Sequence, residues 1–105
     1  MSEANEERIG QASFALRREA AVEQSLAKVR HHLGNNWATL STDEITDLGW
    51  MLGEMWASMG FMAWETVGLE KMTLAIADRL VELARSIRSG AIDETEGVRS
   101  AKELL

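Results

Sequence analysis

The sequence predicts a small all-α protein, folded as a single domain over residues 1–105. Three observations support this fold class. The chain has no proline in its 105 residues, so no residue lacks a backbone N–H or imposes a kink. Apolar residues recur at steps of three and four along most of the chain, which is the period of an amphipathic helix. Helix start and stop signals separate the periodic segments.

The first helix is predicted over about residues 3–33. Its apolar positions begin at Ile9 and continue to Leu33 at helical spacing. Basic residues 30–32 occupy the last turn, where positive charge favours the helix dipole. Gly34 follows as a natural C-terminal stop.

The second helix starts at the clearest local signal in the chain. Ser41 is followed three residues later by Glu44, which is the spacing of a capping box. Leu40 before the cap and Ile45 in the first turn have the spacing of a hydrophobic staple.

A continuous apolar stripe from Ile45 to Ile87 predicts one long helix over about residues 42–88, continuous or bent near Gly68. The alternative is two helices that meet near residues 66–68, because a glycine weakens a helix by about 1 kcal/mol relative to alanine. Ser89 and Gly90 end the element, and Asp93 is placed to cap a short C-terminal helix.

All of the net charge lies in the middle third of the chain. Residues 37–70 contain six acids and no Lys or Arg, while the segments before and after them are balanced, and the chain carries −6 overall. The same third holds all four tryptophans. A surface that is both acidic and apolar is expected to bind another molecule.

One face of the long helix combines small residues with tryptophan, so that another helix can approach closely. Because one neighbouring helix cannot cover a helix that is apolar on nearly all sides, we expect a homodimer through this face. The alternative is a monomer in which the helix folds back and its C-terminal half covers the face. The expected dimer interface comprises Gly49, Trp50, Gly53, Ala57, Gly60 and Trp64.

A narrow polar strip beside that face is the expected docking surface for a foreign partner. Methionine and aromatic residues at its edges would supply the buried area, since both are enriched at adaptable interfaces. The expected partner-binding residues are Met51, Glu54, Ser58, Phe61 and Glu65.

The sequence contains no recognisable catalytic motif, and we expect a protein that is not an enzyme and uses no cofactor. Cysteine is absent, and the only histidines, His31 and His32, point in different directions on a helix and cannot readily bind one metal ion. The acidic balance argues against direct nucleic-acid binding. The apolar segment 48–64 is shorter than the roughly 20 residues of a membrane span, and no signal peptide is evident. These features predict a cytoplasmic protein without a membrane partner.

The chain resembles the bacterial quorum-sensing anti-activators in its size, acidity and helical layout, and in the segment Gly49–Trp56. The resemblance implies a small helical dimer that binds a LuxR-type transcription activator and blocks it; it carries over no residue roles, and other small inhibitors share the same character. We therefore expect a non-catalytic regulator that occludes a protein partner. The alternatives are a small-molecule-sensing helical dimer and a structural helical adaptor in a larger assembly.

Overall fold

The structure is a computed structural model that describes the backbone of residues 3–59, 64 and 70–105, and the side chains of 13–59, 64 and 70–105. These residues form four α-helices, α1 (Glu3–Leu33), α2 (Thr42–Met59), α4 (Leu74–Arg88) and α5 (Glu94–Glu103), and a 3₁₀ helix, η1 (Gly34–Thr39). None of the described elements is a strand. The predicted all-α class is therefore confirmed.

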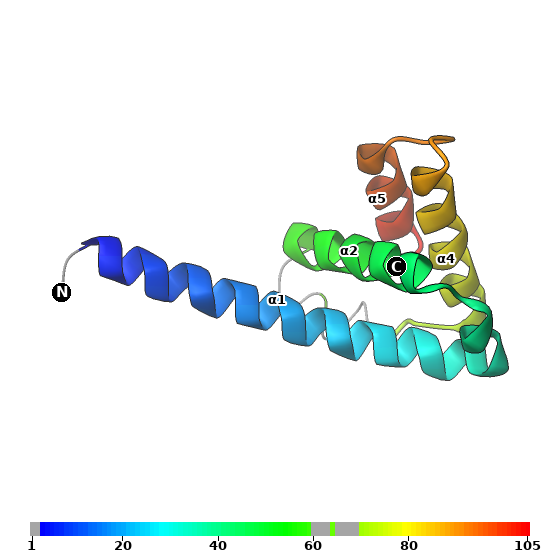
Figure 1. Ribbon diagram of the computed structural model, residues 1–105, viewed down its shortest axis with the longest axis horizontal. Coiled ribbons are helices and arrows are strands. Elements are labelled where there is room, and N and C mark those ends of the chain that lie inside the picture. Colours follow the sequence, from blue (N-terminus) through cyan, green and yellow to red (C-terminus); the bar gives the residue numbers. More distant parts are fainter. Residues whose placement is uncertain (1–2, 60–63, 65–69) are drawn as a thin grey trace.

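Helix α1 runs along one side of the molecule, and its N-terminal half projects beyond the other helices (Figure 1). Its 31 residues span about 46 Å at 1.5 Å per residue, close to the longest dimension of the protein, 49 Å. Helix α2 packs along α1, and α4 and α5 form a hairpin that packs on α2. The helices thus enclose α2 on several sides.

The predicted starts and ends of the helices agree with the structure at four places. Ser41 and Glu44 form both bonds of the capping box, each of 3.1 Å. Gly34 (φ +55°) and Gly90 (φ +80°) take the left-handed conformation that ends a helix. The Asp93 carboxylate accepts a 2.7 Å bond from the Glu96 N–H and caps α5.

The predicted single helix over residues 42–88 is wrong. Thr73 has an extended backbone (φ −130°, ψ 169°), and its hydroxyl accepts a bond from the Ile76 N–H, so a new helix begins at Leu74. The expected bend at Gly68, and the alternative junction at 66–68, lie outside the described residues. The interruption allows α4 and α5 to return over α2, as in the fold-back alternative.

The core lies where α1, α2 and α4 meet. Every third or fourth residue of each helix faces it, which explains why the apolar spacing was visible in the sequence. Its members with less than 2% exposure include Val29 of α1, Leu48, Met51, Leu52 and Met55 of α2, Leu80 of α4, and Trp64.

Candidate functional site

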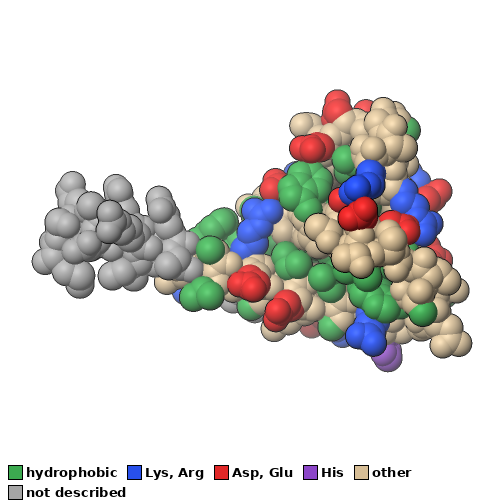
Figure 2. All heavy atoms as spheres, in the orientation of Figure 1, with side chains coloured by type: hydrophobic (Ala, Val, Ile, Leu, Met, Phe, Trp, Pro, Cys, Tyr) green, Lys and Arg blue, Asp and Glu red, His purple; other side chains and the backbone are tan. Residues whose placement is uncertain are grey.

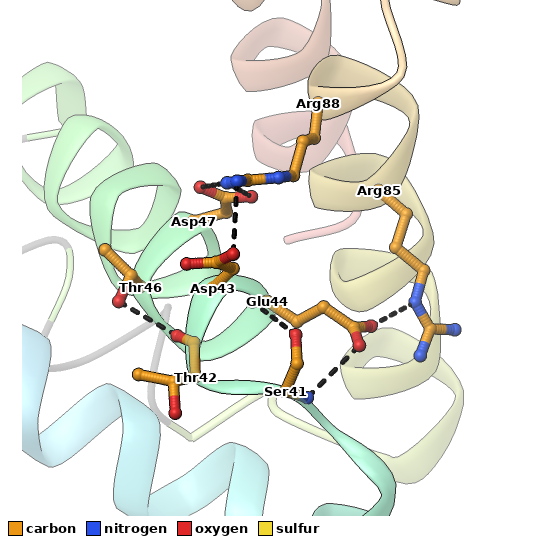
Figure 3. Close-up of polar contacts among 8 residues, drawn as sticks. All are labelled: Ser41, Thr42, Asp43, Glu44, Thr46, Asp47, Arg85 and Arg88. Atoms are coloured by element: carbon orange, nitrogen blue, oxygen red, sulfur yellow. Dashed lines mark hydrogen bonds and ion pairs between the residues drawn. The ribbon is translucent and has the colours of Figure 1, made fainter.

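The acidic start of α2 is paired with the last two turns of α4 (Figure 3). Arg85 Nε lies 2.5 Å from Glu44 Oε2. Arg88 Nη1 donates to both oxygens of Asp47, at 3.0 and 3.1 Å, and its Nη2 lies 3.3 Å from Asp43. Three of the six acids in the middle third are therefore paired with two arginines of the same chain.

The electrostatics of these pairs follow from their hydrogen bonds. The backbone N–H of Ser41, and then the Arg85 guanidinium, hold the pKa of Glu44 below its usual value of 4.5. The carboxylate of Asp47 raises the pKa of Arg88. Because all of these groups reach solvent, the pairs orient the helices more than they stabilise them.

A fourth acid, Glu54, is paired with α1. Arg18 Nη2 lies 2.9 Å from Glu54 Oε1, and both side chains are partly buried. The guanidinium of Arg18 rests on the backbone of Gly53, where a Cβ atom would lie 2.8 Å from Arg18 Nε. Gly53 therefore makes room for a side chain of the same chain.

The structure corrects the expected dimer interface at three of its residues. Gly49 is buried against α1, where a Cβ would meet Val22 and Leu26 at 3.5 and 3.6 Å, and Gly53 is covered by Arg18. Trp64 is fully buried, and its Nε1 donates a 2.9 Å bond to Ser25 Oγ. At Gly49 and Gly53 the helix that approaches closely is therefore α1 of the same chain.

The remaining expected interface residues have different outcomes. Trp50 and Ala57 are exposed, and Gly60 lies outside the described residues. The homodimer itself stays a prediction.

Of the expected partner-binding residues, Met51 is placed in the core and not at the surface. Its side chain is 0% exposed and belongs to the hydrophobic core cluster. Glu54 is half-buried and Ser58 is exposed. Phe61 and Glu65 lie outside the described residues.

The structure brings Trp50, Glu54 and Ser58 together along one side of α2, facing α5. We call the hollow between these helices the Trp50 groove and define it by Trp50, Glu54 and Ser58 of α2 and Glu94, Val98 and Lys102 of α5. Its volume is about 400 Å³. Trp50 is 37% exposed, one of only four large apolar side chains with such exposure among the described residues.

The two ends of the Trp50 groove differ. At one end Lys102 Nζ donates a 2.8 Å bond to Ser58 Oγ and ties α5 to α2. At the other end the groove continues into a second hollow of about 390 Å³ beside α4, which Trp50 and Glu94 also line. Trp50 thus lies at the junction of α2, α4 and α5.

Charges around the Trp50 groove are mixed, as are those on the molecular face in Figure 2, where acidic and basic side chains lie beside one another. Arg88, which lines the second hollow, is paired with Asp43 and Asp47. Arg99, which also lines the Trp50 groove, lies 3.6 Å from both Glu96 and Glu103. The overall acidity of the chain is therefore not concentrated at this site.

The α5 side of the Trp50 groove was missed at the sequence level. Asp93 marked the start of α5, but no sequence signal indicated that Glu94, Val98 and Lys102 face α2. The packing of α5 on α4 sets this position. Gly97 lies against the Ile87 side chain, with no room for a Cβ.

No group of three or more His, Asp or Glu side chains with the geometry of a metal site occurs in the described part of the chain. Among the same residues, no helix combines the length and apolar content needed to cross a membrane.

None of the protein-family models matches the chain, and comparison with the curated proteins and with the solved structures gives no significant match.

Proposed function

We propose that this protein is a non-catalytic regulator that binds a protein partner in the Trp50 groove and occludes part of that partner's surface. The observation that carries the proposal is the exposed Trp50 ring at the junction of two hollows. Tryptophan is enriched among the few residues that dominate binding energy at protein interfaces. A large aromatic ring beside open volume can bury much apolar area on binding.

The shape of the site favours a polypeptide ligand. From Asp47 to Ser58 the side of α2 that lines the two hollows extends over twelve residues, or roughly 18 Å at 1.5 Å per residue. Two helices form its walls. A groove of this kind suits a short helical or extended segment, which is a recurring mode of peptide recognition.

We further propose that the protein partner is a transcription activator. Its support is the resemblance to quorum-sensing anti-activators over the segment Gly49–Trp56. In this segment Trp50 and Glu54 reach the surface and the other six residues are buried. Binding of a transcription activator through this segment would therefore depend on these two side chains.

The proposal is tested by affinity capture from cells that naturally express the protein, followed by binding measurements with the purified partner. Trp50→Ala is expected to lose the partner. Leu74→Ala is the matched control, because Leu74 is a large exposed apolar residue (48%) at the start of α4 and does not line the Trp50 groove. Far-ultraviolet circular dichroism verifies that both variants keep their helices.

Occlusion requires a second readout. The captured partner is assayed for its own interaction, such as dimerisation or DNA binding, with increasing amounts of wild-type protein and of Trp50→Ala. Inhibition by wild type and its loss in Trp50→Ala support the proposal. Equal capture by Trp50→Ala, or a partner whose activity is unchanged when bound, would contradict it. Saturable quenching of tryptophan fluorescence by a metabolite would instead favour the small-molecule sensor.

A further inference from the structure

Glu94 is the carboxylate of the Trp50 groove for which the described residues supply no partner. The other groove acid, Glu54, is held by Arg18 at 2.9 Å. Among the described side chains, none forms an ion pair or hydrogen bond with the Glu94 carboxylate, although Lys102 and Arg99 lie on the same helix. Lys102 donates a hydrogen bond to Ser58. Arg99, which also lines the groove, forms ion pairs of 3.6 Å with Glu96 and Glu103.

Glu94 and Trp50 line the same two hollows. An aromatic ring with exposed area therefore shares these hollows with a carboxylate that is not paired with any described cation. Arg88, which also lines the second hollow, donates to Asp47 through Nη1, and its Nη2 forms an ion pair with Asp43. The local charges thus leave one negative group available to a ligand.

We propose that the Trp50 groove takes a segment of the partner protein whose arginine or lysine side chain lies over the Trp50 ring and pairs with Glu94. The inference rests on the proposed function, because it names the chemistry of the partner that would occupy the same groove. The apolar stem of the ligand side chain would contact Val98 and the ring, while its cationic head reaches the carboxylate.

Two physical effects act together at this point. A cation within about 6 Å of an indole ring is attracted by the negative face of the ring, and tryptophan is the strongest aromatic partner. The Glu94 carboxylate adds a charge-assisted hydrogen bond. Arginine is favoured over lysine, because its planar guanidinium can stack on the ring and bond the carboxylate at the same time.

The test uses the full chain and small probes of defined charge. ¹⁵N-labelled protein is titrated with N-acetyl-arginine amide to millimolar concentration, and the indole N–H signal of Trp50 is followed, assigned by its absence in Trp50→Phe. The neutral probe N-acetyl-citrulline amide has nearly the same shape as the arginine probe and reports on contacts that do not need charge. A saturable shift with the arginine probe and little or none with citrulline is expected.

The variant Glu94→Gln removes the charge and keeps the size of the side chain. It is expected to weaken binding of the arginine probe by about threefold or more, as for a partly exposed ion pair. Glu96→Gln is the matched control, because Glu96 lies in the same turn but lines neither hollow. The affinity of the Glu96→Gln variant for the arginine probe is expected to equal that of the wild type.

Three outcomes would overturn the inference: no shift of the Trp50 signal, equal shifts with arginine and citrulline, or equal loss of affinity in Glu94→Gln and Glu96→Gln. These outcomes are distinct from failure of the proposed function. If Trp50→Ala loses the captured partner while Glu94→Gln retains it at full affinity, the groove binds a partner but not through a cation. If Trp50→Ala retains the partner, the proposed function itself fails.

Discussion

Replacement of Gly49 by alanine tests how the small-residue face of α2 is used. In the structure, the added Cβ meets Val22 Cγ1 at 3.5 Å and Leu26 Cδ1 at 3.6 Å, which are ordinary van der Waals distances. Alanine also favours the helix by about 1 kcal/mol relative to glycine. No clash offsets this gain, so Gly49→Ala is expected to increase the free energy of unfolding by up to about 1 kcal/mol.

The measurement is thermal unfolding followed by circular dichroism. For a domain of this size, about 1 kcal/mol corresponds to a rise in Tm of roughly 4–8 °C. Gly53→Ala is the matched comparison, because it has the same helical gain but its Cβ would displace Arg18, at 2.8 Å, from its pair with Glu54. It is expected to raise Tm less than Gly49→Ala does.

A loss of stability in Gly49→Ala would refute this reasoning. It would indicate that a backbone, and not the side chains of α1, lies against Gly49. If that loss came with dissociation of a dimer in light scattering, the original expectation of a helix crossing at this face would be restored.

Three further predictions concern the packing and charges around the core. Gly97→Ala is expected to lower the free energy of unfolding by up to about 2 kcal/mol, since the overpacking cost exceeds the helical gain. The added Cβ would lie 2.6 Å from Ile87 Cγ1. Denaturant unfolding measures the loss, and shortening Ile87 to alanine should recover part of it. Ser25→Ala leaves the Trp64 indole N–H without its acceptor and is expected to lower the free energy of unfolding by about 1–3 kcal/mol. Denaturant unfolding measures this loss, and an unchanged denaturation midpoint would contradict the buried hydrogen bond. Because the folded pKa of Glu44 is lowered, its contribution is present above its usual pKa of 4.5 and is lost as the pH falls through the folded value. The stability difference between wild type and Glu44→Gln should therefore shrink in acid, and a difference that grows below pH 4.5 would contradict the assigned pairing.

Local signals in the sequence were sufficient to place the ends of most helices. Ser41 with Glu44, Gly34 and Asp93 act through bonds or dihedral angles within a few residues of themselves, so their effect does not depend on the rest of the fold. Thr73 was a signal of the same kind that was overlooked. Its hydroxyl caps α4, but the apolar stripe continues in phase across it and no proline or glycine marks the position.

The use of the acidic middle third could not be predicted from the sequence, because it depends on which helices meet. Counting charges along the chain treated the acids of α2 as an unbalanced surface. Folding places Arg85 and Arg88 of α4 beside Asp43, Glu44 and Asp47. Tertiary contacts between residues more than 40 positions apart therefore pair half of the six acids in this third with arginines.

The candidate site was predicted in part. Glu54 and Ser58 were expected on one docking strip of the helix, whereas Trp50, four residues before Glu54, was assigned to the dimer interface, although helical geometry places all three on one side of α2. Met51 was assigned to the surface because it falls outside the apolar stripe of the predicted long helix and flanks the polar strip. Glu94 and Val98 join the site through the α4–α5 hairpin, whose orientation no local pattern specifies.

The most direct test of the central claim is to map the contact surface of the captured partner on ¹⁵N-labelled protein. The account predicts that backbone signals of Trp50, Glu54 and Ser58, and those of Glu94 to Lys102, change on binding, while the exposed start of α4 around Leu74 does not. Changes confined to the outer surfaces of α1 or α4, with the signals of the Trp50 groove unmoved, would contradict it.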